Sequence, residues 1–201
     1  MLIFDSLSKR FGEREILSSL SYHFPDQGRF LLMAPSGAGK TTLLRLICGL
    51  EKPDSGKVTL TCKRLSVAFQ EPRLLPWLTV LENIRLVLPD QEAREDTAMH
   101  YLRALELEVA ANQYPAALSG GMKNRASLAR ALAFGGDLLL LDEPFAGLDD
   151  SLKARIAPVI CAAGDGGLTI TVSHHKEDAA LLGAKILTLT GTPVTALSEK
   201  E

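Results

Sequence analysis

The fold is decided by one stretch of sequence, Phe30-Leu31-Leu32-Met33-Ala34-Pro35-Ser36-Gly37-Ala38-Gly39-Lys40-Thr41-Thr42. It begins with an apolar run typical of a buried strand, passes through a glycine-rich loop, and enters a helical pattern over 42–49. Glycines let successive backbone N–H groups turn inward, and a helix N-terminus adds positive potential. A strand, such a loop and a helix in this order predict a phosphate-binding site.

The surrounding sequence alternates between strand and helix patterns, which predicts a mostly parallel sheet. The predicted elements after the loop are a turn at 53–56, strands at 58–60, 65–69, 138–141, 168–172 and 186–190, and helices at 151–163 and 176–182. Residues 1–33 indicate strands and turns. Between about 71 and 133 the pattern becomes helical, with interruptions near Pro89 and Pro115, so we expect a helical subdomain inserted in a single domain of 1–201.

Three further motifs follow the phosphate loop in a fixed order. They are Leu118-Ser119-Gly120-Gly121-Met122, the acidic pair Asp142-Glu143 after four leucines, and Ser173-His174 after an apolar strand. With the loop, this order resembles the ATP-binding subunit of an ABC transporter over nearly the whole chain. The resemblance implies an α/β P-loop NTPase (RecA-like) fold: a mostly parallel sheet core, an antiparallel β subdomain and an inserted α-helical lobe.

The resemblance assigns ATP and Mg²⁺ to residues of the phosphate loop and its neighbours. Lys40 would contact the β- and γ-phosphates, and the Thr41 hydroxyl would help to hold Mg²⁺. The family pattern begins the loop with glycine where this chain has Ala34, whose Cβ disfavours positive φ. The expected ATP-binding residues are Phe11, Ala34, Pro35, Ser36, Gly37, Ala38, Gly39, Lys40, Thr41 and Thr42. Phe11 would stack on adenine, although a phenylalanine is also a routine core residue.

Four side chains outside the loop receive roles in hydrolysis from the same resemblance. Asp142 would coordinate Mg²⁺ through water, and Glu143 would position or deprotonate the attacking water. Gln70 would touch Mg²⁺ and that water, and His174 would sense the γ-phosphate. The plain alternatives are a solvated acidic pair, a surface glutamine and a structural histidine. His175 stands where the family more often has an acidic residue.

The segment from Leu118 to Met122 belongs, by resemblance, to the active site of the opposite subunit. Ser119, Gly120 and Gly121 would bind the γ-phosphate of ATP held there, and Asp149 would reach the opposite phosphate loop. The family more often has glutamine in place of Met122. Ser119 is alternatively a simple cap for a helix predicted at 123–133.

The segment after Gln70 is similar to importer subunits of the nitrate, sulfonate and taurine group. It reads Glu71-Pro72-Arg73-Leu74-Leu75-Pro76-Trp77. Exposed Leu75 and Trp77 would then line a groove for a helix of the membrane partner. The alternative places Trp77 in the core. This resemblance implies a second ATP-binding subunit in a homodimer, transmembrane permease subunits and, indirectly, an extracytoplasmic solute-binding protein.

Composition limits the partners and the location. The chain has 201 residues, 46% of them hydrophobic and 23% charged, with a formal net charge of −2. This balance gives no general attraction to nucleic acid. The start, Met1-Leu2-Ile3-Phe4-Asp5, carries no basic leader before a long apolar region. We therefore expect the chain to stay in the cytosol, and the resemblance to transporter subunits implies a peripheral position on the cytoplasmic face of the membrane, held by the permease subunits.

Two other readings remain open from sequence. A soluble ABC ATPase of DNA repair would insert a long coiled coil before Ser119, yet only about 77 residues separate Thr41 from Ser119. A translation ATPase would usually join two such cassettes in one chain. A nucleotide-binding regulator without turnover is the third possibility. The solute is not encoded here, because the other subunits would select it.

Overall fold

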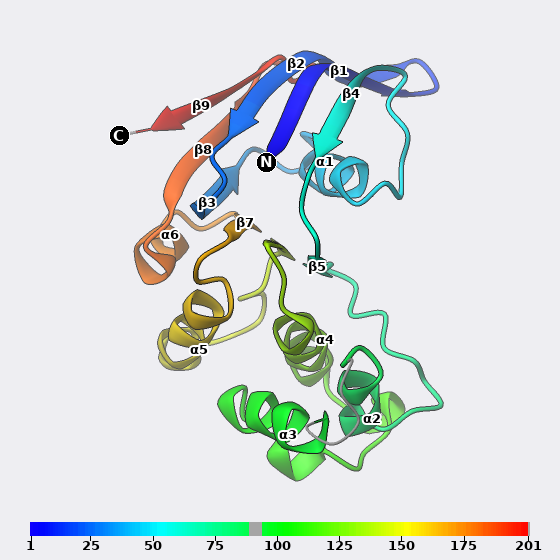
Figure 1. Ribbon diagram of the computed structural model, residues 1–201, viewed down its shortest axis with the longest axis vertical. Coiled ribbons are helices and arrows are strands. Elements are labelled where there is room, and N and C mark those ends of the chain that lie inside the picture. Colours follow the sequence, from blue (N-terminus) through cyan, green and yellow to red (C-terminus); the bar gives the residue numbers. More distant parts are fainter. Residues whose placement is uncertain (89–93, 201) are drawn as a thin grey trace.

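The computed structural model describes residues 1–88 and 94–200, which form two sheets with helices between and below them (Figure 1). The strands are β1 (Leu2–Phe11), β2 (Arg14–Phe24), β3 (Gly28–Met33), β4 (Ser55–Leu60), β5 (Leu65–Ala68), β6 (Leu138–Asp142), β7 (Leu168–Val172), β8 (Lys185–Thr190) and β9 (Ala196–Lys200). The α-helices are α1 (Lys40–Ile47), α2 (Val80–Arg85), α3 (Arg94–Ala104), α4 (Gly120–Phe134), α5 (Asp150–Ala163) and α6 (Glu177–Leu182). Two 3₁₀ turns lie at Glu108–Ala110 and Pro115–Ala117.

The larger sheet carries the phosphate loop at one edge. Its strand order is β5-β6-β7-β3-β8-β9, and all neighbours are parallel except β8 and β9. Leu140 pairs with Ile170, and Leu32 pairs with Val172, so β6, β7 and β3 end at nearly the same level. Residues that follow these three strands therefore meet at one edge of the sheet. The antiparallel strand β9 was not predicted.

The smaller sheet is antiparallel, with strand order β2-β1-β4. β1 pairs with β2 from Leu2↔Phe24 to Phe11↔Arg14, through several irregularities. The turn predicted at 53–56 is partly wrong, because β4 already begins at Ser55. Gly56 has a φ of 73°, and a Cβ there would lie 2.3 Å from the Ser6 carbonyl oxygen. Glycine therefore lets β4 approach β1 closely at this point.

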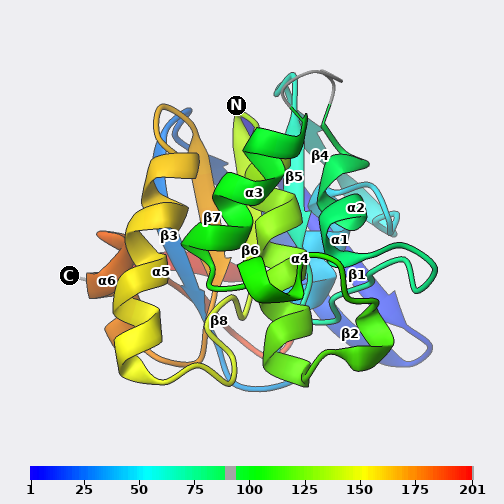
Figure 2. The same ribbon diagram turned by 90° about the horizontal axis from the view of Figure 1, so that it is seen from below.

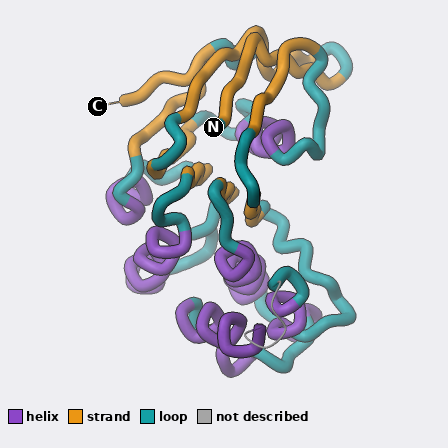
Figure 3. Tube along the Cα trace, in the orientation of Figure 1, coloured by secondary structure: helices purple, strands orange, loops and turns teal. Residues whose placement is uncertain are grey.

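Alternation along the leucine run of β6 divides the interior into two cores. Leu138 and Leu140 point to the core that contains α1, whereas Leu139 and Leu141 point to the core that contains α4 and α5. A strand covered on both faces is apolar throughout, as this run is. Helix α1 lies between the two sheets, and α4 and α5 cover the opposite face of the parallel sheet (Figure 3).

The helical pattern between 71 and 133 differs in detail from the structure. Residues 71–79 form no helix; α2 begins at Val80 behind Thr79, whose hydroxyl and Glu82 form a capping box. The predicted interruption near Pro89 lies outside the described residues. The interruption near Pro115 is a 3₁₀ turn. Helices α2, α3 and α4 pack on one another (Figure 2) and lie at the other end of the molecule from β1 and β2 (Figure 1).

Candidate active site

The loop between β3 and α1 takes its shape from glycines. Gly39 caps α1 with a φ of 96°, and a Cβ there would lie 2.4 Å from Cγ2 of Ile16. Gly37 has a φ of 74°. Both positions therefore require glycine. Ala34 is not among the described residues of positive φ, so alanine carries no backbone penalty at this position.

Lys40 lies folded over the loop, with 8% of its surface exposed. Its ammonium donates to the carbonyl oxygens of Ala34 at 2.7 Å and Pro35 at 3.2 Å. Desolvation by burial lowers the pKa of Lys40, while the charges of Glu143 and Asp142 oppose that shift. A phosphate group would offer this buried cation an anionic partner in place of neutral carbonyl groups.

Asp142 ends β6 beside α1 and is only 4% exposed. The Thr41 hydroxyl donates to its Oδ2 at 3.0 Å. Desolvation by burial raises the pKa of Asp142, against the opposing effects of the Thr41 hydroxyl, the Lys40 charge and the Gln70 backbone N–H. A buried carboxylate beside hydroxyl and amide oxygens is a donor set of the kind that Mg²⁺ prefers. The residues present therefore fit a Mg²⁺ ion.

Glu143 is held in a left-handed backbone conformation with a φ of 53°. Its N–H donates to the Val172 carbonyl at 3.0 Å, and its Oε1 lies 3.3 Å from Nε2 of His174. That approach does not have hydrogen-bond geometry, and Oε1 is buried without a hydrogen-bond partner among the described residues. Desolvation raises the pKa of Glu143, partly offset by the nearby His174. An aligned water could supply the missing partner and lose a proton to this oxygen.

These groups meet in one cavity of about 260 Å³ at the carboxyl edge of the parallel sheet. The lining residues are Ile16, Ser36, Gly37, Gly39, Lys40, Thr41, Thr42, Gln70, Asp142, Glu143 and His174. The structure thus brings most of the phosphate loop together with the four side chains predicted to act in hydrolysis, whereas Ala34, Pro35 and Ala38 of the loop do not line this cavity. Two contributors were missed from sequence. Ile16 reaches the loop from β2, and Arg14 donates to the Gly37 carbonyl at 3.1 Å.

The serine and glycines after Leu118 lie outside this cavity, at the start of α4. Helix α4 begins at Gly120 rather than at the predicted 123, and the Ser119 hydroxyl accepts from Met122 N–H at 3.3 Å. Ser119 therefore caps α4, which was the alternative to a role in the opposite subunit's site. A Cβ on Gly120 or Gly121 would meet nothing within 4 Å, so this N-terminus is open. Asp149 likewise caps α5, by accepting from Leu152 N–H at 2.9 Å.

Three other predicted site residues also lie away from the cavity. Trp77 is 69% exposed, so the alternative that places it in the core is wrong. Leu75 is only half-buried rather than fully exposed, and Asn83 hydrogen-bonds both its backbone N–H and its carbonyl. Phe11, 46% exposed at the end of β1, lies 5.0 Å from the Lys9 ammonium.

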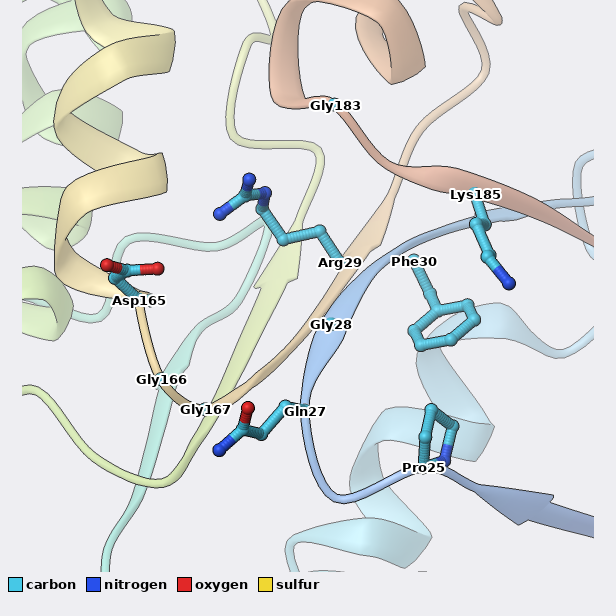
Figure 4. A pocket seen from close by; sticks show the side chains of 11 residues that line it. Pro25, Gln27, Gly28, Arg29, Phe30, Asp165, Gly166, Gly167, Gly183 and Lys185 are labelled. Carbon is cyan, nitrogen blue, oxygen red and sulfur yellow. The ribbon is translucent and has the colours of Figure 1, made fainter.

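A larger cavity of about 540 Å³ lies at the opposite, amino edge of the same sheet (Figure 4). Gly164 and Gly183, which end α5 and α6, both line it. The Arg29 side chain extends between Asp165 and Gly183. Its buried Nε has no hydrogen-bond partner among the described residues. Helix C-termini carry partial negative charge, which favours this cation and disfavours a phosphate.

Comparisons with known proteins identify the family of the chain. The ABC transporter family model matches residues 17–146. The aliphatic sulfonates import ATP-binding protein SsuB of Granulibacter bethesdensis is 42% identical over 90% of this chain and 76% of that relative. The SsuB of Escherichia coli O1:K1 / APEC is 38% identical over 92% of this chain and 76% of that relative.

Comparison with solved structures also finds ABC transporter cassettes. Two dimeric structures of the bacterial ABC transporter cassette MJ0796, one in a post-hydrolysis state bound to ADP and Pi, superpose with a TM-score of 0.87. They are 26% and 27% identical and cover 100% of this chain and 98% of theirs. The predicted fold class is thereby confirmed. Within the described residues, each helix is too short or too polar to cross a bilayer.

Proposed function

The chain belongs to the ABC transporter family and is an ATPase that powers a membrane importer, and we propose that the imported solute is an aliphatic sulfonate. One observation carries the ATPase assignment: Lys40, Asp142 and Glu143 meet in a single cavity at the end of the phosphate loop. The solute assignment rests on the names of relatives that are 37–42% identical to this chain over the aligned residues.

The phosphate loop would bind the triphosphate of ATP. Its backbone N–H groups and the N-terminus of α1 supply positive potential, and Lys40 would exchange the carbonyls of Ala34 and Pro35 for the β- and γ-phosphates. Thr41, Asp142 and Gln70 would hold Mg²⁺. That ion would neutralise charge on the β- and γ-phosphates. Phe11 would stack on the adenine from the end of β1.

Hydrolysis needs a proton acceptor beside the γ-phosphate, and Glu143 is our candidate. Its buried, unsatisfied Oε1 is free to accept a hydrogen bond and a proton from water, and desolvation raises the pKa of Glu143, which makes it a stronger base than an exposed glutamate. His174 lies 3.3 Å away, close enough to orient Glu143 and to contact a γ-phosphate in the same cavity. The left-handed backbone at Glu143 fits the strain often found at catalytic residues.

Two copies of the chain would complete two sites. Leu118, Ser119, Gly120, Gly121, Met122 and Asp149 lie outside the cavity of their own chain, which supports the proposal that they act on the ATP of a partner. The open start of α4 offers N–H groups to a γ-phosphate. Since the solved neighbours are dimeric cassettes, we propose a homodimer.

The permease is the proposed membrane partner, with an extracytoplasmic solute-binding protein delivering cargo to it. Exposed Trp77 and half-buried Leu75 lie in the segment between Gln70 and α2, where a helix of the permease could dock. We further propose that 71–133 acts as a helical subdomain within one domain of 1–201. The chain would then sit peripherally on the cytoplasmic face of the membrane.

Two measurements test this proposal together. Copurification from native membrane in mild detergent should recover permease subunits with the chain, and a strain without the chain should lose uptake of a labelled alkanesulfonate. Re-expression of the chain should restore uptake, whereas Glu143→Gln should not. Recovery with ribosomes or DNA alone would favour the soluble ATPases. Uptake of another solute instead would retain the importer but refute the sulfonate assignment.

A further inference from the structure

Asp178 is a buried carboxylate that none of the roles above uses. It lies near the start of α6 and is 1% exposed. Its Oδ2 accepts from the Ser173 hydroxyl at 2.6 Å, and its Oδ1 lies 3.4 Å from the Lys153 ammonium. Both carboxylate oxygens are therefore engaged, by two different segments of the chain. Burying a charge costs free energy unless the charge is paired and hydrogen-bonded. The groups that pair with Asp178 therefore indicate what the residue does.

The first partner fixes the peptide chain on both sides of His174. Ser173 follows β7, and its N–H donates to the Leu32 carbonyl at 3.4 Å. Because its hydroxyl hydrogen goes to Asp178, a lone pair of Oγ is left to accept from the His175 N–H at 3.0 Å. Residues 173 and 175 are thus anchored to the same carboxylate. The imidazole between them lies 3.3 Å from Glu143.

The second partner connects this carboxylate to α5. Lys153 lies one turn into α5, and its N–H donates to the carbonyl of Asp149 at 3.0 Å. Its side chain is largely buried against Asp178. Buried ion pairs add little stability compared with apolar packing, and their clearest effect is to select one geometry. The pair therefore fixes α6 against the helix whose cap is Asp149.

We propose that Asp178 is a positioning residue for hydrolysis, which holds His174 beside Glu143 through Ser173 and keeps that arrangement in register with α5 through Lys153. The inference rests on the proposed role of His174 in the ATPase reaction. It assigns Asp178 no contact with nucleotide, since Asp178 does not line the cavity. Its effect should appear in turnover rather than in ATP binding.

Asp178→Ala, Asp178→Asn and Ser173→Ala test the proposal, with Glu177→Gln as the control on an exposed neighbour in α6. Displacement of a reacting group by about 1 Å can cost on the order of 100-fold in rate. We expect Asp178→Ala to lower kcat about 10- to 100-fold with KM changed less than about twofold. Asp178→Asn retains an acceptor for Ser173 and should lose less. Glu177→Gln should match the wild type.

The decisive comparison repeats Asp178→Asn in a His174→Ala background. Residues that act as one unit are not additive, so the second substitution should then lower kcat no further. An equal fold-loss in both backgrounds would assign Asp178 a general structural role and overturn the inference. So would wild-type kcat in both Asp178→Asn and Ser173→Ala.

Amide exchange at His175 gives a readout that does not need turnover. Loss of the Ser173 hydroxyl or of the Asp178 carboxylate should speed exchange of the His175 N–H at least about 10-fold, while amides of β7 stay protected. Unchanged exchange refutes the network itself. A wild-type dimer that fails to hydrolyse ATP, with exchange responding as expected, would instead contradict the proposed function and with it any positioning role in hydrolysis.

Discussion

The two edges of the parallel sheet carry glycine-containing cavities that face opposite ends of helices. The carboxyl edge has a cavity of about 260 Å³ where α1 begins, and the amino edge has one of about 540 Å³ where α5 and α6 end. Both contain glycines and one lysine, but the smaller cavity has two carboxylates, Asp142 and Glu143, and the larger one has Asp165 together with Arg29. The smaller one is the candidate ATP site, because a helix N-terminus faces it. Helix direction therefore outweighs volume in locating an anion site here.

The largest expected difference between the two edges is in kcat, when one acidic residue at each edge is replaced by its amide. Glu143→Gln removes the proposed proton acceptor and should lower kcat by about 10²- to 10⁴-fold, while ATP still binds and traps a dimer. Asp165→Asn, at the amino edge, should leave kcat within about twofold. Steady-state hydrolysis and size-exclusion chromatography with ATP measure both. Rapid turnover by Glu143→Gln would contradict the general-base role.

Paired lysine changes should give the next largest effect, on binding. Lys40→Ala removes the buried ammonium from the phosphate loop and should weaken ATP binding by about 100-fold or more, since charged hydrogen bonds to phosphate contribute roughly 1.5–3 kcal/mol each. Lys185→Ala removes only an exposed ion pair with Glu199 and should leave affinity unchanged. Calorimetric titration with ATP compares them. Equal affinities would remove the distinction between the two edges.

Replacing one glycine at each edge by alanine should affect ATP affinity at the carboxyl edge only. Gly39→Ala places a Cβ against Ile16 in addition to its unfavourable φ, so ATP affinity should fall about 10-fold or more. Ile16→Ala should restore part of that loss. Gly166→Ala, at the amino edge, has a φ of 77° but open space, so it should cost about 1 kcal/mol of stability and no affinity. An unaffected Gly39→Ala would mean that the loop tolerates displacement.

The smallest expected effect concerns stability without nucleotide. The pKa of Asp142 is raised in the folded chain, chiefly by desolvation, so its ionised form destabilises the fold at neutral pH. Asp142→Asn should therefore raise the Tm of the nucleotide-free protein by a few degrees at pH 7. This gain should shrink as pH falls through the raised pKa, because folded wild-type protein then takes up the proton. Thermal melts across pH measure it, and a lower Tm at pH 7 would contradict the desolvation argument.

Local pattern predicted the parts of the site that lie at strand ends. The runs at 138–141 and 168–172 coincide with buried strands, and the residues after them meet the phosphate loop as parallel pairing requires. Ile16 was missed because it reaches the loop from the other sheet, which no local signal encodes. Asp178 was missed because its role depends on contacts with Ser173 and Lys153 that form only in the folded chain. β9 was missed because apolar and polar residues do not alternate clearly over Ala196–Lys200.

The core around α1 has a consequence for how the chain is made. It joins Leu2, Leu43, Leu140 and Val194, so residues from both ends of the chain share one interior. β3 lies between β7 and β8, which are synthesised more than a hundred residues later. On the ribosome, α1 emerges long before its cover is complete, with its leucines open to water and to other chains. The leucines of α1 are therefore covered fully only after β7 and β8 have been synthesised and have paired with β3.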